Sequence, residues 1–231
     1  MNFAWERLAD GVHRCRLPFL DVTVGLVCGR TAALLIDAGT TLAEAAAINA
    51  DVMEISGRAV SHIVLTHNHF DHILGSSVFV DAEVYCAAEV ATTIADRPEH
   101  LRADAVRHGA DPEEVARAIA ALRTPEHRVR DVDLDLGGRS VAVRHPGRGH
   151  TDHDLIVVAP GPPETVVFCG DLVEESGDPV IDDDSDAAAW PATLGLVLDA
   201  GGAHGAFVPG HGAVVDAGFV DRQRAWLRNR V

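Results

Sequence analysis

The segment Thr66-His67-Asn68-His69-Phe70-Asp71-His72 places four strong metal-binding side chains within six residues. It directly follows Ser61-His62-Ile63-Val64-Leu65, a short, branched and aliphatic run that is typical of a buried strand. Residues two apart in an extended chain point the same way, so we expect His67, His69 and Asp71 to converge on one side. A lone histidine is more often a surface or core residue than a ligand, but a run of this density predicts a metal site.

His72 can reach that site only if the backbone turns after the strand. Asp71 lies where a helix would begin, and residues 73–79 have the composition of a helical continuation. Coiling at this point would carry His72 to a second position beside the first. The segment therefore predicts two neighbouring metal positions.

Length and composition favour a single domain over residues 1–231. With 231 residues, 47% of them hydrophobic, the chain can bury one sizeable core and is short for two. No run approaches the roughly 18 apolar residues of a membrane span. The start of the chain, residues 1–7, lacks a charged stretch followed by an apolar one, so we expect a cytoplasmic protein that does not enter a membrane.

The chain is strongly acidic, with a formal net charge of −16, and all 19 of its basic residues are arginine. Such a surface repels phosphate backbones, which argues against general binding to nucleic acid or anionic membranes. A small-molecule substrate is the expected partner, and the sequence leaves the oligomeric state undetermined. The four cysteines, none in a Cys-x-x-Cys pair, lie in apolar strand-like runs and are expected to be small buried hydrophobes: Cys15, Cys28, Cys86 and Cys169.

Apolar spacing predicts strands and helices on both sides of the histidine-rich segment. Before and just after it we expect strands at 12–17, 21–28, 31–37 and 82–86 and a helix at 42–55. In the second half we expect strands at 127–132, 140–145, 154–159, 165–169 and 205–208, and helices at 186–199 and 218–230. Two such halves can face each other sheet to sheet, with helices outside and strand-end loops along one edge.

Residues 87–123 are rich in Ala, Glu, Arg and His, and Pro98 and Pro112 stand where helices would start. We expect two or three short helices here, as a helical insertion that covers the site. The alternative is a plain outer layer packed on a sheet.

Three later segments each end a predicted strand with a potential ligand next to glycine: His150 after Gly149, Asp171 after Gly170, and His211 after Gly210. Glycine allows a sharp turn or a close backbone approach. We therefore expect these three residues on loops at strand ends, aimed at the same point as the first cluster.

The ordered set closely resembles the pattern of the metallo-β-lactamase-fold hydrolases, which is His-x-His-x-Asp-His, then a His after Gly, an Asp after Gly and a late Gly-His. The resemblance covers essentially the whole chain. It implies an α+β fold, a four-layer αββα sandwich of two facing mixed sheets, with two metals at one edge. It also implies His67, His69 and His150 on one metal, Asp71, His72 and His211 on the other, and Asp171 as a bridge between them.

Three neutral imidazoles suit zinc, whereas a position richer in carboxylates also accepts iron or manganese, so we expect two divalent ions with zinc favoured. A hydroxide shared by two ions would attack the substrate, with Asp71 orienting it and passing a proton to the leaving group. Alternatively, Asp71 is a ligand alone. The expected activity is hydrolysis of a small ester, thioester or lactone bond, and a β-lactam is a further candidate substrate.

Two other functions stay open. Single-iron persulfide dioxygenases share the motif, and the resemblance would then place one iron on His67, His150 and Asp171. A non-catalytic binding module is the third reading, although an intact ligand set favours chemistry. The loop between Asp171 and Asp186, together with Trp190, is expected to border the pocket, while Asp182-Asp183-Asp184 can also be a solvated turn. Among the remaining histidines, His145 and His153 are either surface or core residues or lie near the pocket.

Overall fold

Two mixed sheets face each other in the computed structural model, which describes residues 1–161 and 164–230. The first sheet has seven strands in the order β1 to β7: Glu6–Ala9, Val12–Arg16, Thr23–Cys28, Ala33–Ile36, His62–Val64, Glu83–Cys86 and His127–Arg128. The second has five, in the order β12, β11, β10, β9, β8: Ala206–His211, Val166–Glu174, Ile156–Ala159, Ser140–Arg144 and Asp131–Asp135. Strands β1 to β4 pair antiparallel and β4 to β7 parallel, whereas in the second sheet only β11 and β12 are parallel.

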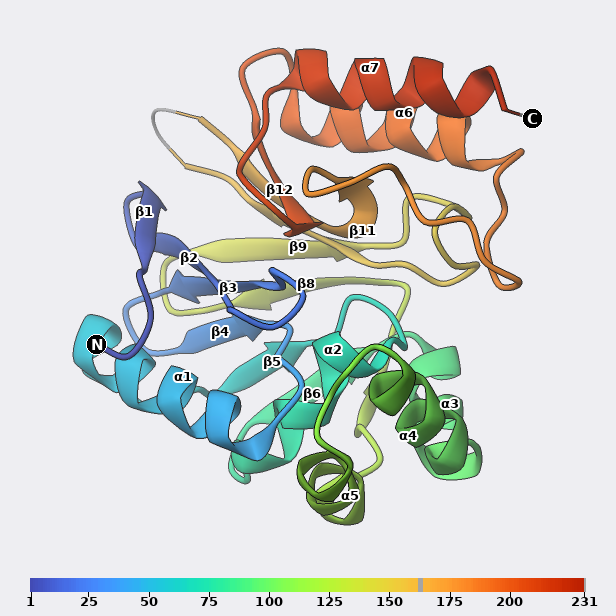
Figure 1. Cartoon of the computed structure of the whole chain (residues 1–231). Helices are drawn as coiled ribbons and strands as arrows, with labels where there is room; N and C mark the ends of the chain where they lie inside the picture. The colour runs from blue at the N-terminus through green and yellow to red at the C-terminus, as the bar shows by residue number, and fades with distance from the viewer. Residues whose placement is uncertain (162–163, 231) are drawn as a thin grey trace.

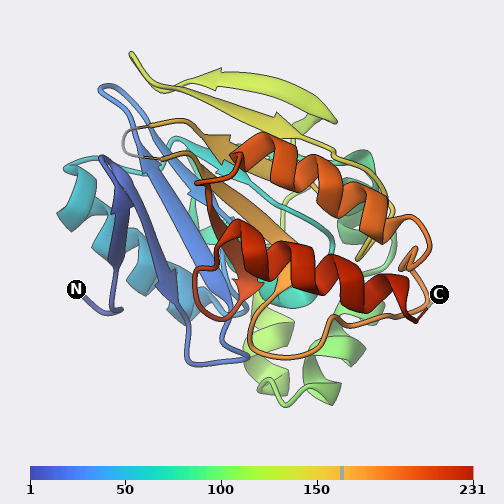
Figure 2. The ribbon, with the colours of Figure 1, turned by 90° about the horizontal axis from the view of Figure 1, so that it is seen from above.

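Helices cover the outer faces of both sheets. Figure 1 shows α6 (Trp190–Gly201) and α7 (Ala217–Arg228) over the second sheet and α1 (Leu42–Ser56) under the first. Seen from above, α6 and α7 lie side by side across β11 and β12 (Figure 2). The expected four-layer αββα sandwich is therefore confirmed.

Strand β11 shows why this arrangement buries two cores. Its alternate residues Val166 and Phe168 belong to the large core between the sheets, and Val167 and Cys169 belong to a second core beneath α6 and α7. A strand buried on both faces reads as a continuous apolar run, because each face packs against its own layer. Contact between the sheets is close: a Cβ atom added to Gly25 of β3 would lie 2.4 Å from the ring of Phe168.

Helix starts follow the capping residues in the sequence. Thr41 caps α1, accepting from the Glu44 N–H at 3.1 Å while the Glu44 carboxylate accepts from the Thr41 N–H at 3.0 Å. Region 87–123 contains three helices, α3 (Ala88–Asp96), α4 (Pro98–Arg107) and α5 (Pro112–Ala121), and the last two start at the expected prolines. None of the helices in the described ranges is long and apolar enough to cross a bilayer.

Several boundaries differ from the sequence expectation. Strand β1 was not predicted, and the expected strand 127–132 is two short strands, because the chain crosses there from β7 in the first sheet to β8 in the second. The helix expected from Asp186 begins at Trp190, since the Asp186 carboxylate instead holds a turn by accepting from the Ala189 N–H at 2.9 Å. The four cysteines are free, and all but the half-buried Cys28 are fully buried.

Candidate metal centre

Seven potential ligands from five segments meet at one edge of the sandwich. His67 and His69 follow β5, Asp71 and His72 lie in the short helix α2 (Phe70–Ile73), and His150 lies on the loop after β9. Asp171 lies within β11, and His211 is the last residue of β12. These are the seven residues that the sequence singled out, and the structure brings all of them together.

Two details expected from strand geometry were wrong. Asp71 groups with His72 and His211, as the family resemblance implied, rather than with His67 and His69 as strand alternation suggested, because α2 begins at Phe70 and ends the extended alternation at His69. Asp171 is not on a loop after its strand. Strand β11 continues to Glu174 beside β12, with an irregularity in the pairing around Gly170.

The first cluster consists of His67, His69, His150 and Asp171, whose donor atoms all lie within 4.8 Å of one another. His150 Nε2 lies 3.0 Å from His69 Nδ1, and Asp171 Oδ2 lies 3.5 Å from His67 Nε2 and from His150 Nε2. Three imidazoles and one carboxylate oxygen thus face a common point. This donor set fits zinc, which binds histidine and carboxylate ligands in a tetrahedral arrangement.

The second cluster consists of Asp71, His72 and His211. His211 Nε2 lies 3.3 Å from His72 Nε2 and 3.4 Å from Asp71 Oδ2. Asp171 reaches this cluster as well, with Oδ1 3.2 Å from His72 Nε2 and Oδ2 3.3 Å from His211 Nε2. Asp171 is therefore shared by both clusters.

Hydrogen bonds behind the imidazoles fix which ring nitrogen faces the clusters. Asp37, 2% exposed, accepts from the Thr66 hydroxyl and binds His72 Nδ1, both at 2.9 Å. Because the Thr66 hydroxyl gives its proton to Asp37, it accepts from His67 Nδ1, 2.9 Å away. In their neutral forms His67 and His72 therefore both direct the Nε2 lone pair toward the clusters, as metal-binding histidines do. Burial lowers the pKa of His72, but Asp171, Asp71 and Asp37 outweigh it and raise that pKa well above its ordinary value, so a metal ion there would take the place of the Nε2 proton.

Hydrogen bonds also fix the ring orientation of two other cluster histidines, His211 and His69. His211 Nδ1 donates to the Leu20 carbonyl at 2.7 Å, so Nε2 is the nitrogen that faces the second cluster and that a metal ion would bind in place of a proton. His69 is turned the other way: its Nε2 faces Asp184 Oδ2 at 3.4 Å, so Nδ1 faces the cluster. The acidic run at 182–184 is thus more than a solvated turn, because one of its carboxylates orients a cluster histidine.

The donor atoms fit a cation. His67 Nε2 and Asp171 Oδ1 are buried and have no hydrogen-bond partner among the residues described. Buried polar atoms are normally satisfied, so two such atoms in one place call for a partner. The close nitrogen pairs also set lone pairs against each other, an arrangement that a divalent ion between them would turn from repulsive to attractive.

The two clusters differ in charge. Burial lowers the pKa of His150 to about 4 and the pKa of His67 well below its ordinary value, which keeps these two imidazoles neutral, whereas the contact with Asp184 outweighs burial at His69 and raises its pKa. Burial also lowers the pKa of His211, but Asp171 and Asp71 outweigh it and raise that pKa to about 10. The carboxylates of the second cluster therefore favour positive charge on its imidazoles, which a bound cation would supply in place of the protons.

Sequence reasoning missed two acidic residues, Asp37 and Glu174. Asp37 looked like the end of a strand, although its φ of +59° in a buried position is unusual for a residue other than glycine. Glu174 was expected in the loop that borders the pocket, but it ends β11, is 7% exposed and forms a group with Asp171 and His211. Burial raises the pKa of Glu174 to about 8.

Two positions next to ligands are glycine because neighbouring side-chain atoms lie too close to the backbone there for a Cβ atom. A Cβ atom at Gly210 would lie 1.8 Å from Asp171 Oδ1, so any side chain there would displace the shared carboxylate. Gly170 has a φ of +51°, and a Cβ atom there would lie 2.9 Å from Thr66 Oγ1. Both glycines let β11 and β12 approach the first ligand segment.

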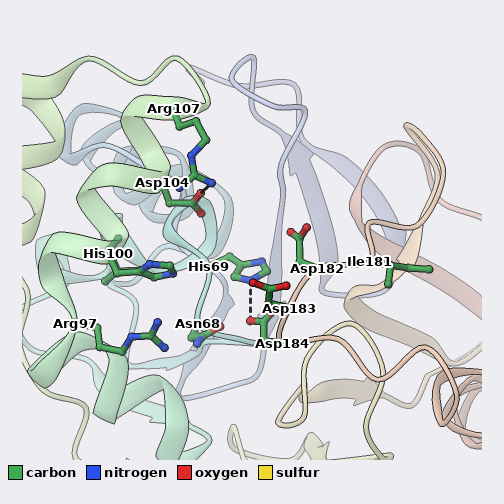
Figure 3. A pocket seen from close by; sticks show the side chains of 11 residues that line it. Asn68, His69, Arg97, His100, Asp104, Arg107, Ile181, Asp182, Asp183 and Asp184 are labelled. Atoms are coloured by element: carbon green, nitrogen blue, oxygen red, sulfur yellow. Dashed lines mark hydrogen bonds and ion pairs between the residues drawn. The ribbon is translucent and has the colours of Figure 1, made fainter.

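Connected cavities lead to the clusters. One of about 220 Å³ is lined by cluster residues together with Leu20, Phe70, Glu174 and Val180. It shares His69, Asp104 and Asp182 with a second cavity of about 480 Å³. In Figure 3, Arg97 and His100 project from the α4 side of this second cavity, Asp182, Asp183 and Asp184 lie opposite, and His69 stands between them. The acidic loop therefore borders the pocket, as expected.

The other residues considered from sequence lie around this centre. Trp190 is fully buried and supports His150 from behind, with ring centroids 5.8 Å apart in an edge-on contact. His153 lines a third cavity with Asn68 and Arg97, whereas His145 binds the Asp154 carbonyl at 2.9 Å through Nδ1.

Comparison with known proteins agrees with this geometry. The sequence model of the metallo-beta-lactamase superfamily matches residues 17–219, whereas no curated protein matches significantly. The structure is similar to a metallo-beta-lactamase from Pontibacter korlensis, with a TM-score of 0.75 and 20% identity over 98% of this chain and 99% of that one. It is also similar to VMB-1, with a TM-score of 0.74 and 18% identity over 99% and 97% of the two chains. At these identities the structural likeness shows the fold, and the matched sequence model shows that the chain belongs to the metallo-beta-lactamase superfamily.

Proposed function

We propose that this chain is a two-metal hydrolase that cleaves a small ester, thioester or lactone bond, with β-lactams as a further substrate class of the same chemistry. The observation that carries the proposal is the pair of donor clusters that share Asp171 at one sheet edge. Each cluster brings at least three donor side chains together, and the second has its own orienting bonds at His72 and His211. Orienting bonds of this kind are typical of residues that bind metal.

Two divalent ions held there would lower the pKa of a shared water and polarise the bond under attack. His67, His69 and His150 would hold one ion, for which zinc is favoured, and Asp71, His72 and His211 would hold the other, which can be zinc, iron or manganese. Asp171 would contribute to both and fix their separation.

Asp71 is the residue proposed to handle protons. Its Oδ2 lies 3.4 Å from His211 Nε2, and the side chain also lines the cavity next to the clusters. A carboxylate in this place can orient the attacking water and then pass a proton to the leaving group.

The substrate proposed is a small molecule. The cavity at the clusters and the larger one beside it measure about 220 and 480 Å³, in the range of small-ligand sites. Helix α4 forms one wall of the larger cavity, which supports a covering role for the helical insertion. The carboxylates of Asp182, Asp183 and Asp184 on the other wall would repel polyanions such as nucleic acid.

Replacing His211 tests this proposal against its main alternative. His211→Ala should lower the metal content of fully loaded protein from near two ions per chain toward one and severely reduce ester or lactone hydrolysis, because the second position loses a ligand. A matched control is His108→Ala, since His108 lines the same cavity but belongs to neither cluster. That variant should keep both ions.

The alternative, a single-iron persulfide dioxygenase, makes a different forecast. Its iron would be held by His67, His150 and Asp171, so His211→Ala would leave the stoichiometry unchanged and affect activity only indirectly. Oxygen uptake with glutathione persulfide should be measured on the same preparations. Unchanged metal content, with wild-type oxygen uptake that follows iron loading, would replace the hydrolase proposal with the dioxygenase.

A further inference from the structure

Glu174 is a buried carboxylate that the seven-ligand scheme leaves unused. Its side chain ends β11 at 7% exposure, and its Oε1 is buried with no hydrogen-bond partner in the described part of the chain. The side-chain oxygen of the neighbouring Gln223 accepts from the Glu174 backbone N–H at 3.0 Å. Gln223 makes no hydrogen bond to the Glu174 carboxylate in the described part of the chain. A buried acidic group without a partner is costly unless a cation or a donor compensates it.

The surroundings of Glu174 identify what could compensate it. One carboxylate oxygen of Glu174, one of Asp171 and a ring nitrogen of His211 all lie within 4.8 Å of one another. In a regular strand, residues 171 and 174 would point to opposite faces. The pairing of β11 with β12 is irregular between Gly170 and Glu174, where Glu174 comes opposite His211, and this irregularity lets both acids face the same side.

We propose that Glu174 is a further ligand of the second metal position, binding the same ion as Asp171 and His211. This inference rests on the proposed two-metal centre. With Glu174, the second position would have three carboxylate ligands and two imidazoles, whereas the first has three imidazoles and one shared carboxylate. Carboxylates suit manganese and imidazoles suit zinc, so Glu174 shifts the preference of the second position, relative to the first, toward manganese or ferrous iron.

Manganese binding tests the ligand role without any assay of hydrolysis. Metal-free protein is first loaded with one equivalent of zinc and then titrated with Mn(II), and the EPR signal of free Mn(II) reports the binding. Glu174→Gln keeps the shape of the side chain and removes its charge, and it should weaken Mn(II) binding at least tenfold. Zinc titrated in the same way should lose less affinity, because His72 and His211 still supply the nitrogen ligands that zinc prefers.

Asp182→Asn is the matched control, because Asp182 lines the same cavity but is outside the metal-binding groups. It removes one negative charge near the centre and should change Mn(II) affinity by less than about twofold, since charges exposed to water are strongly screened. Glu174→His should restore zinc binding at the second position and not manganese binding.

Mn(II) binding by Glu174→Gln that equals the wild type, or an equal loss in Asp182→Asn, would overturn the ligand role of Glu174. Mn(II) affinity restored by Glu174→His would overturn the selectivity argument. Failure of the wild type to bind any second ion would instead contradict the two-metal proposal itself, so the two failures are distinguishable by stoichiometry.

Discussion

The two proposed metal positions lie at the same edge of the sandwich but differ in their donors. The first is rich in imidazoles, of which His67 contacts Thr66 and His150 contacts Trp190. The second is rich in carboxylates, and Asp171 and Asp71 raise the pKa of His211 to about 10 where burial alone would lower it. This difference teaches that one scaffold offers two donor sets of different chemistry, mainly imidazole nitrogen in the first and more carboxylate oxygen, including that of Asp71, in the second.

The largest effect should come from Asp71, which belongs only to the second position. Asp71→Asn keeps the shape of the side chain but removes the charge that orients the water, so kcat should fall by about 10² to 10⁴ with KM little changed. Asp104→Asn is a suitable control, because Asp104 lines the same cavity and pairs with Arg107. Near-normal turnover in Asp71→Asn would remove its proton role and leave it as a ligand alone.

A smaller loss of metal affinity is expected when Asp37 or Thr66 is replaced, because these residues contact the cluster histidines without belonging to the clusters. The two variants should distinguish the two metal positions. Asp37 binds His72 directly and His67 through Thr66, so Asp37→Asn should weaken metal binding at both positions by about 10 to 100 fold. Thr66→Val removes the hydroxyl that contacts His67 directly and reaches His72 only through Asp37, so it should weaken the first position more than the second. Isothermal titration with zinc and then manganese measures both. Equal losses at both positions in Thr66→Val would contradict the separation.

The smallest effect concerns the wall of the larger cavity. Arg97 projects from the α4 side and has no salt bridge or hydrogen bond through its side chain to the residues described, so it is free to contact an anionic group of a substrate. Arg97→Ala should raise KM about two- to fivefold for a substrate with a carboxylate, since an exposed ion pair contributes about 1 kcal/mol or less. A neutral analogue of the same substrate should show no change, and equal shifts for both would exclude a charge contact.

The seven-ligand set could be predicted from the sequence because each ligand stands in a local pattern, either the dense run at 67–72 or a residue next to glycine. The residues that orient these ligands could not be predicted from the sequence. Asp37 contacts Thr66 and His72, which lie 29 and 35 residues away in the sequence. No local sequence pattern predicts contacts at that separation. Glu174 was missed for another reason: the strand was expected to end at residue 169, whereas β11 continues to Glu174 with irregular pairing that brings Glu174 opposite His211.

The fold could likewise be predicted only where local sequence signals exist. Apolar runs predicted most strands and the three helices of region 87–123, because burial and caps leave local signals. The split between β7 and β8 has no such signal, since both halves read as one strand and only the pairing partners differ. Helix α6 began later than expected because Asp186 caps a turn that precedes it.

The central claim is that two donor clusters hold two ions, and metal content per chain tests it most directly. Protein prepared without added metal and then loaded with zinc in excess, with free metal removed, should contain close to two ions per chain by elemental analysis, because the two clusters offer more ligands than one tetrahedral ion can use. Fully loaded, folded protein that never exceeds one ion per chain would contradict the account.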